Sequence, residues 1–188
     1  PFAIPAFLAV LVWGGLLNDD FGIVNQVTGL DIPWLFDPTW ARVSAILVNV
    51  WIGFPYWFLV CTGALQVVPE ELTEAARVDG AGPFQLFRKV TLPLLMVATA
   101  PLLIASFAFN FNVFNNIYLL TRGGPYTEDQ TVAGSTDILI SYTYKLAFQA
   151  GGGAQYGLAA AVSIFIFFIV AGISAISWWR TKFLENVR

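Results

Sequence analysis

Long apolar segments alternate with shorter polar ones along this chain of 188 residues. Residues 43–65, 94–120 and 156–179 contain no Asp, Glu, Lys or Arg. Each of these segments is long enough for the roughly 20 residues that an α-helix needs to cross the hydrocarbon core of a membrane. Residues 2–17 are also apolar but fewer, and we interpret them as a fourth spanning helix whose beginning is missing. The pattern predicts an all-α integral membrane protein with spans at about 2–17, 41–65, 94–120 and 156–179.

The charged side chains lie mainly between these segments and indicate which ends face the cytoplasm. The loop 66–93 holds Arg77, Arg88 and Lys89, and Arg180 follows the last span. The loops 18–40 and 121–155 are rich in Asp and Glu instead. Because Lys and Arg are enriched on the cytoplasmic side of membrane proteins, we expect the loop 66–93 and the C-terminus to be cytoplasmic. The other two loops are then extracytoplasmic.

Composition argues against several other classes of function. The net charge is −3 and no basic cluster is present, which argues against a nucleic-acid partner. Histidine is absent and Cys61 stands alone, so the sequence predicts no metal site, no disulfide and no Ser/His/Asp catalysis. Gly151-Gly152-Gly153 lacks the lysine of a phosphate-binding loop. We therefore expect no enzyme, no cofactor, and no ATP binding by this chain itself.

The loop 66–93 has the most distinctive polar pattern. Pro69 suits the first position of a helix, and two acidic residues follow where the helix dipole favours negative charge. Gly80 suits the end of that helix, and Pro83 suits the start of a second one. The pattern predicts two short helices joined by a sharp turn, which form a projection on the cytoplasmic side. The simpler alternative is an ordinary connector between two spans.

Polar side chains within the span 94–120 need partners, because lipid offers none. Ser106 and Asn110 are four residues apart and share a helix face, with Phe109 beside them. Hydroxyl and amide groups next to an aromatic ring can bind a sugar, since the polar groups bond its hydroxyls and the ring stacks on its C–H face. The alternative is that Ser106 and Asn110 hydrogen-bond to neighbouring helices. The sequence leaves both interpretations open.

A second such face lies on the span 41–65 and comprises Asn49, Ile52, Gly53 and Tyr56. Tyr56 offers a ring and a hydroxyl near mid-membrane, or else packs within the helix bundle. Pro55 and Pro101 each remove a hydrogen bond from their helix and loosen it. Two polar faces beside two weakened points predict a central substrate site between mobile helices.

The extracytoplasmic loops contain one further predicted element. Ser135-Thr136-Asp137 are residue types that cap a helix N-terminus. After them an apolar stripe continues at helical spacing through Ile138, Leu139, Tyr142 and Leu146. We expect a short helix that rests on the membrane interface or on the bundle, and we expect Trp34 and Trp40 to be interfacial anchors.

These motifs resemble a known family, the permease subunits of binding-protein-dependent ABC importers. The family's EAA loop is matched by Glu74-Ala75-Ala76, by Asp79-Gly80 and by the later Leu92-Pro93, all at the family's spacing. From about Arg42 onward the chain is similar to the C-terminal half of the maltose/maltodextrin permeases of this family. That similarity is carried by Gly53-Phe54-Pro55-Tyr56, residues 105–112, Leu119-Leu120-Thr121 with Gly123-Gly124-Pro125, Tyr142-Thr143-Tyr144 with Ala147-Phe148, Gly151-Gly152-Gly153 and residues 157–161.

The resemblance implies a type I ABC importer transmembrane domain in the bacterial inner membrane that moves maltose or maltodextrin by alternating access. It implies as partners a second permease subunit, two ATPase subunits that bind the ATP, a periplasmic sugar-binding protein and membrane lipid. The implied sugar contacts are Ile52, Gly53, Tyr56, Ser106, Phe109 and Asn110. The implied coupling residues are Glu74, Ala75, Ala76, Asp79 and Gly80.

One departure from the family and three other functions remain to be weighed. Val113 stands where the family has a second substrate-facing asparagine, so the particular sugar is left open. The nearest alternative function is a related permease for another sugar. An ion-coupled carrier predicts ionisable residues within the spans, and apart from Arg42 at the start of the span 41–65 the spans hold no Asp, Glu, Lys or Arg. A passive channel leaves the cytoplasmic projection unexplained.

Overall fold

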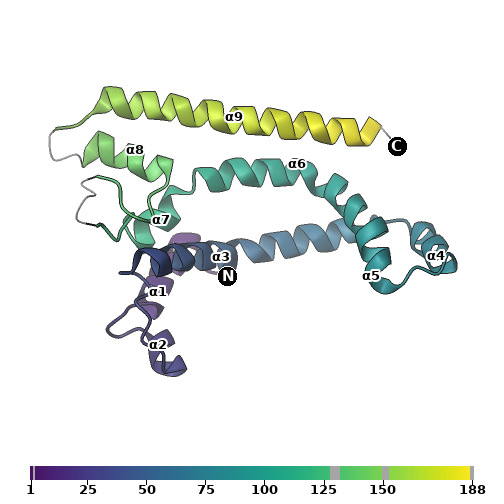
Figure 1. Ribbon diagram of the computed structural model, residues 1–188, viewed down its shortest axis with the longest axis horizontal. Helices are drawn as coiled ribbons and strands as arrows, with labels where there is room; N and C mark the ends of the chain where they lie inside the picture. The colour runs from purple at the N-terminus through teal and green to yellow at the C-terminus, as the bar shows by residue number, and fades with distance from the viewer. Residues whose placement is uncertain (2, 128–131, 150–152, 187–188) are drawn as a thin grey trace. The chain divides into compact units, whose positions relative to one another are not determined.

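The computed structural model describes residues 1, 3–127, 132–149 and 153–186, and all regular structure within these ranges is helical (Figure 1). The chain divides into two compact units. The first unit is Pro1–Pro55 with Phe109–Val170, and the second is Tyr56–Ala108 with Ala171–Arg188. The all-α membrane class predicted from the sequence is confirmed. Gly151 and Gly152, part of the glycine run considered above, lie outside the described residues.

Three helical stretches of the described residues are long and apolar enough to cross a membrane, namely Pro38–Leu65, Pro83–Phe111 and Tyr156–Thr181. A fourth apolar helix, shorter than these three, is also present among the described residues. The expected first span is helix α1, Ala6–Leu16, which has 11 residues against the roughly 20 that a span needs. It ends there because the Asn18 side chain accepts hydrogen bonds from the backbone N–H groups of Asp20 and Phe21, which turns the chain. Phe2, where the span was expected to begin, is not described.

Helix α1 packs within the first unit through its apolar side chains. Val10 and the following Leu17 are fully buried against Val48 and Leu120. Val48 belongs to α3, Pro38–Leu65, and Leu120 ends α7, Phe114–Leu120. This cluster joins three helices that are distant in sequence, and it is the main apolar core of the unit.

Helix α3 begins at Pro38, three residues before the predicted start of its span. The Asp37 side chain accepts hydrogen bonds from the backbone N–H groups of Thr39 and Trp40 at 2.9 and 3.0 Å. Asp37 therefore caps the helix, and Pro38 occupies the first position, where proline fits. Before it, helix α2, Ile23–Thr28, ends at Gly29, whose φ of 67° suits glycine.

The predicted continuous helix over 94–120 is wrong. Helix α6, Leu92–Phe111, ends before Asn112, and α7 begins at Phe114. Between them Val113 has φ −76° and ψ 65°, and the N–H of Phe114 donates to the carbonyl of Asn112 at 2.8 Å. These values define an inverse γ-turn. Asparagine-rich sequence favours such a break, because asparagine competes with helical hydrogen bonding.

The short helix predicted after Ser135-Thr136-Asp137 is present as α8, Leu139–Phe148, with Leu146 buried. Asp137 precedes the helix and accepts hydrogen bonds from the Ser141 hydroxyl at 2.7 Å and from the N–H of Gly134 at 2.7 Å. Its carboxylate also pairs with Lys145 at 2.5 Å, and Lys145 is only 4% exposed. The Lys145 ammonium group donates in addition to the Tyr126 hydroxyl at 2.6 Å. Asp137 therefore connects the loop that contains Gly134 to Ser141 and Lys145 of α8.

Glycine is required where the loop passes this ion pair. Gly123 has φ 82°, and a side chain there would collide with Asp137 and Lys145. A side chain at Gly134 would collide with the backbone of Gly123. Helices α7 and α8 also meet through aromatic rings, and the ring centroids of Phe114 and Tyr144 lie 4.9 Å apart. A hydrogen bond with Tyr118 raises the pKa of Tyr144 above its ordinary value.

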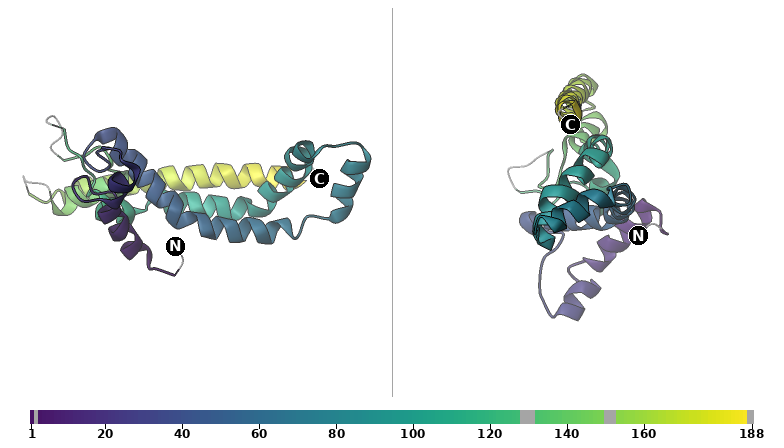
Figure 2. Two further views of the ribbon diagram at one scale, coloured as in Figure 1. Left: turned by 90° about the horizontal axis from the view of Figure 1, so that it is seen from below. Right: turned by 90° about the vertical axis from the view of Figure 1, so that its right-hand side faces the viewer.

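The second unit contains the two short helices predicted for the loop 66–93. Helices α4, Glu70–Val78, and α5, Pro83–Leu86, are joined by a tight turn (Figure 2). A short π-helical segment, Phe87–Thr91, then leads directly into α6. The two short helices are therefore confirmed, but the spanning helix begins at Pro83 and not at residue 94.

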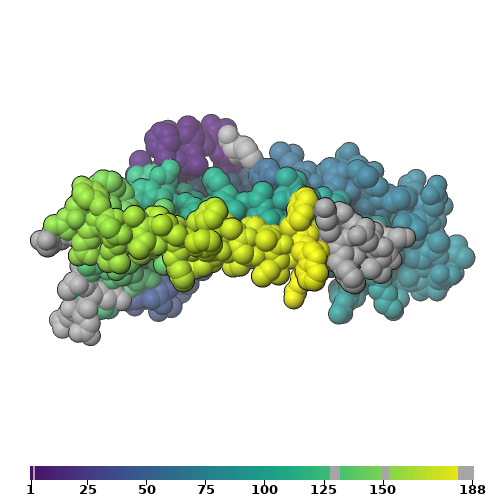
Figure 3. All heavy atoms as spheres, turned by 90° about the horizontal axis from the view of Figure 1, so that it is seen from above, coloured from purple at the N-terminus to yellow at the C-terminus, as the bar shows by residue number. Residues whose placement is uncertain are grey.

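Helix α9, Tyr156–Asn186, runs beyond the predicted end of the last span at residue 179. Its side chains face the viewer in Figure 3, and many of them are large, apolar and exposed, including Phe165, Phe167 and Phe168. Such an apolar surface suits lipid or other membrane helices.

The ion pair of Asp137 and Lys145 yields a stability prediction. Lys145→Met should lower the free energy of unfolding by about 3–5 kcal/mol, because the Asp137 carboxylate would stay buried without its cation. The change is measured as the thermal unfolding of the purified membrane protein. Lys89→Met, at an exposed lysine, is the control. Adding Asp137→Leu to Lys145→Met should recover part of the loss, and equal unfolding temperatures for Lys145→Met and Lys89→Met would contradict the prediction.

Candidate transport site and coupling loop

The six residues predicted to contact a sugar are distributed over both units of the chain. Ile52, Gly53, Phe109 and Asn110 belong to the first unit. Tyr56 and Ser106 belong to the second unit, which also contains the projection formed by α4 and α5. Each group is positioned by its own unit.

In the first unit Asn110 takes part in a chain of three asparagine side chains. The Asn49 amide donates to the Asn110 side-chain oxygen at 2.9 Å, and the Asn116 amide donates to the Asn49 side-chain oxygen at 2.8 Å. The chain links α3, the end of α6, and α7. The interhelical hydrogen bonding considered for Asn110 is therefore present, although Asn110 remains exposed. A role in holding helices and a role in binding are compatible at this residue.

The neighbours of Asn110 differ in their packing. Phe109 is 72% exposed, so its ring is available to a partner. Ile52 is partly buried and packs against the apolar core that contains Val48 and Leu120. Gly53 is partly buried, with open space where a side chain would begin. Phe109 and Asn110 are the most accessible residues of this face.

In the second unit Tyr56 presents its ring and hydroxyl at the surface. It is 39% exposed and packs edge-to-face on Trp57, with ring centroids 5.6 Å apart. Ser106 is partly buried within α6. Pro55 and Pro101 both lie inside helices, as the sequence predicts.

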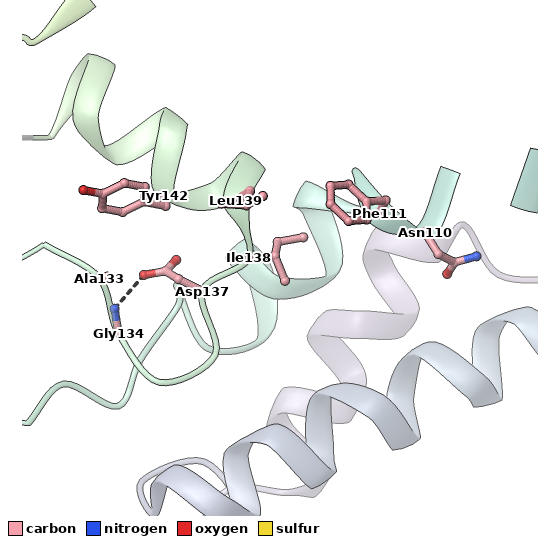
Figure 4. Close-up of a pocket in the computed structure, with 8 residues that line it drawn as sticks. All are labelled: Asn110, Phe111, Ala133, Gly134, Asp137, Ile138, Leu139 and Tyr142. Carbon is pink, nitrogen blue, oxygen red and sulfur yellow. Dashed lines mark hydrogen bonds between the residues drawn. The ribbon is translucent and has the colours of Figure 1, made fainter. Parts of the chain in front are cut away.

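A hollow of about 690 Å³ lies in the first unit next to Asn110. Its lining is mainly apolar and comes from the end of α6, the outer loop and α8: Asn110, Phe111, Ala133, Gly134, Asp137, Ile138, Leu139 and Tyr142. Figure 4 shows the Asp137 carboxylate, which accepts a hydrogen bond from the N–H of Gly134, on one side of this hollow. The sequence did not reveal it, because only the fold brings residues 110 and 133–142 together.

The projection of the second unit ends in a turn that requires glycine. Gly80 has φ 81°, its N–H donates to the carbonyl of Arg77 at 3.0 Å, and the N–H of Ala81 donates to that of Ala76 at 2.9 Å. These two backbone hydrogen bonds together form the Schellman motif, a common end of an α-helix. The expected coupling residues Glu74, Ala75, Asp79 and Gly80 are exposed, and Ala76 is partly buried.

Large apolar side chains surround that turn without being covered. Val78 is 87% exposed, and Leu72, Phe84 and Phe87 are exposed as well. Apolar side chains gathered at the surface mark sites of interaction with other proteins or membranes. Among the described residues, no group of His, Cys, Asp or Glu side chains could hold a metal ion.

Comparisons with known proteins agree on one family. The family model described as "Binding-protein-dependent transport system inner membrane component" matches residues 1–178. The chain is 48% identical over 187 residues to the "Maltose/maltodextrin transport system permease protein MalF" of Klebsiella aerogenes. It is 47% identical to the protein of the same name from Escherichia coli. In both cases the match covers 97% of this chain and 36% of the relative, so this chain spans about a third of the relatives' length.

A solved structure matches the fold in the same way. It is the crystal structure of a bacterial ABC transporter involved in the import of the acidic polysaccharide alginate. The TM-score is 0.76 at 28% sequence identity, and the match covers 95% of this chain and 61% of that chain. The sequence match over residues 1–178 and the shared helical fold give one conclusion: this chain belongs to the family of binding-protein-dependent transport system inner membrane components.

Proposed function

We propose that this chain is part of the membrane-spanning permease subunit of an ATP-driven importer that moves maltose or maltodextrin across the bacterial inner membrane. The observation that carries the proposal is the 47–48% identity to MalF permeases over 97% of the chain. The exposed projection of α4 and α5 and the apolar, membrane-length helices support the same assignment. Transport proceeds by alternating access.

The partners follow from this role. A second permease subunit completes the membrane part, two ATPase subunits hydrolyse ATP, and a periplasmic binding protein delivers the sugar. The apolar side chains around Gly80 are exposed and form the proposed contact with an ATPase subunit. The basic residues of this loop and those after the last span support a multi-pass topology with a cytoplasmic C-terminus. The chain itself is a transport component and has no catalytic role.

The sugar contacts in this proposal are Ile52, Gly53, Tyr56, Ser106, Phe109 and Asn110. The rings of Tyr56 and Phe109 stack on the sugar, and the side chains of Ser106 and Asn110 hydrogen-bond to its hydroxyls. Exposure of both rings and of the Asn110 amide supports this division of roles.

A related importer for another sugar is the second candidate function. Two observations favour it: the matched structure belongs to an alginate importer, and Val113 offers an apolar side chain in the turn after Asn110. Alginate is acidic, and the proposed contact residues include no cationic side chain. That composition favours a neutral sugar over an acidic one.

The proposed function is tested by uptake into proteoliposomes that contain the complete importer with its binding protein. Radiolabelled maltose and maltotriose should accumulate only when ATP is supplied on the ATPase side. An alginate oligosaccharide should not compete, because the proposed contact residues provide no positive charge for its carboxylates. Uptake of the alginate oligosaccharide without uptake of maltose would favour the second candidate, and sugar flux without ATP would contradict an ATP-driven importer.

The sugar contacts make a separate prediction. Tyr56→Ala should weaken equilibrium binding of labelled maltose to the purified importer by about 5- to 30-fold, since a stacking ring and a hydrogen bond are lost. Tyr56→Phe is the matched control, because it keeps the ring and removes only the hydroxyl. We expect it to retain most of the affinity. If Tyr56→Ala binds maltose with normal affinity, Tyr56 is a packing residue of the helix bundle.

The coupling turn makes a prediction that depends on a single backbone angle. Gly80→Val should strongly reduce transport and the ATPase stimulation that sugar delivery causes, because a β-branched residue is strained at φ 81°. Gly82→Val is the matched control: Gly82 has φ −70° and ψ 164°, and no atom lies near its missing side chain. Maltose binding should be unchanged in both variants. Equal transport by the two variants would remove the Gly80 turn from the coupling mechanism.

A further inference from the structure

The segment 18–37, between α1 and α3, folds into a small lobe of the first unit that contains α2. Side-chain hydrogen bonds hold its turns together. The Trp34 indole N–H donates to the Asn25 side-chain oxygen at 2.7 Å, and the Asn25 amide donates to the carbonyl of Ile32 at 2.9 Å. The lobe therefore has a defined inner side and a defined surface.

The lobe lies alongside the first turns of α3 and not beyond the end of that helix. The Ser44 hydroxyl donates to the carbonyl of Trp34 at 2.9 Å. Ser44 is about 9 Å from Pro38 along the helix axis, at about 1.5 Å per residue. Val24 of α2 packs against the apolar core that contains Val48, which is further along α3. The lobe therefore reaches about two turns past the start of this membrane-length helix.

The length of α3 relates that position to a depth in the bilayer. Its 28 residues extend about 42 Å, close to the roughly 40–45 Å thickness of a bilayer with its headgroups. A point about 9 Å inside the helix start then lies near the boundary between headgroups and acyl chains. Amphipathic segments that bind to a membrane surface rest at this boundary.

The surface of the lobe is apolar. Val27 of α2 is 79% exposed, and Ile23, four residues earlier on the same helix face, is exposed as well. Val24, next to Ile23, packs inward against the core. The large apolar side chains that the lobe exposes are Phe21, Ile23, Val27, Leu30 and Phe36. Side chains of this kind at the depth of the acyl boundary suit contact with lipid.

The charged side chains of the lobe are all acidic, because the segment 18–37 has four Asp and no Glu, Lys or Arg. Asp37 caps α3, whereas Asp20 and Asp31 are exposed. Burial raises the pKa of Asp19, and the neighbouring charges of Asp20 and Asp31 raise it further, so these three carboxylates lie near one another. Anionic headgroups repel such a cluster, whereas the ammonium group of a zwitterionic headgroup can approach it.

We propose that the lobe 18–37 is an interfacial membrane anchor, whose exposed apolar side chains enter the headgroup–acyl boundary of a leaflet that presents zwitterionic lipid. The depth of the lobe favours lipid over a water-soluble protein, which would require a surface that stands clear of the bilayer. The leaflet is the one opposite the projection of α4 and α5, because α3 crosses the membrane between the two. Since Trp34 and Val24 connect the lobe to α3, the anchor fixes the depth of the first turns of that helix. The proposal goes beyond the proposed function and does not depend on which sugar is carried.

The test is the accessibility of a nitroxide spin label at position 27 in the complete importer, reconstituted in phosphatidylcholine nanodiscs. Val27→Cys carries the label, and its high exposure means that little packing is lost. Cys61 and any other reactive cysteine are replaced by serine. Collisions with oxygen, which is concentrated in the bilayer, should be several-fold more frequent than collisions with a water-soluble nickel chelate. A label at Asp31→Cys, in the same lobe, is the matched control and should meet the nickel chelate more often, because Asp31 faces headgroups and water in the proposed arrangement.

Leu30→Cys is the second labelling site, for the case in which the label at position 27 disturbs assembly. Replacing part of the phosphatidylcholine by phosphatidylglycerol should lower the ratio of oxygen to nickel collisions at position 27, and replacing it by phosphatidylethanolamine should not. An unchanged ratio with phosphatidylglycerol would contradict the preference for zwitterionic lipid.

Two other results would overturn the anchor itself. Infrequent collisions with both reagents at position 27 would show that protein covers the lobe. Frequent and equal nickel collisions at positions 27 and 31 would place the lobe in water. No sugar takes part in these measurements, so failure of the anchor leaves the proposed function intact, and failure of sugar uptake leaves the anchor intact.

Discussion

Polar groups on helices in a membrane must find their partners within the protein, because lipid has no hydrogen bonds to offer. Among the residues that the structure describes, no buried side-chain nitrogen or oxygen lacks a partner. The asparagine chain of α3, α6 and α7 satisfies this constraint with three neutral side chains. The same amide groups can bind a polar solute, so the constraint that holds the helices together also prepares a site for one.

Charged side chains lie in different parts of this protein from the neutral polar side chains of the asparagine chain. The membrane-length segments 43–65, 94–120 and 156–179 have no Asp, Glu, Lys or Arg. The one ion pair found between described residues joins Asp137, just before α8, to Lys145 within α8, and Ser141, Gly134 and Tyr126 complete its hydrogen bonds. The neutral spans fit the uncharged sugar of the proposed function, in which ATPase subunits supply the energy for uphill transport.

In the proposed function, the projection of α4 and α5 receives this energy. Its turn is fixed by Gly80 and by backbone hydrogen bonds to Ala76 and Arg77, while its apolar side chains remain exposed. A rigid turn that carries an apolar surface can transmit a displacement, whereas a flexible connector cannot. The π-helical segment Phe87–Thr91 continues directly into α6, so the projection and the spanning helix share one backbone. Tyr56 and Ser106 belong to the same unit as this projection.

The sequence by itself determined the class of the protein, most helix positions and the turn at Gly80. Apolar segment length is enough for the spans, and the local rules for proline, acidic residues and glycine are enough for α4, α5 and the turn at Gly80. It did not determine where helices break. The turn at Val113 forms where Asn116 of α7 hydrogen-bonds to Asn49 of α3, a partner 67 residues away in the chain. The Asp137–Lys145 pair and the hollow beside Asn110 likewise join segments that helical periodicity cannot relate, because periodicity describes one helix at a time. Only the tertiary structure decided which polar side chains became partners.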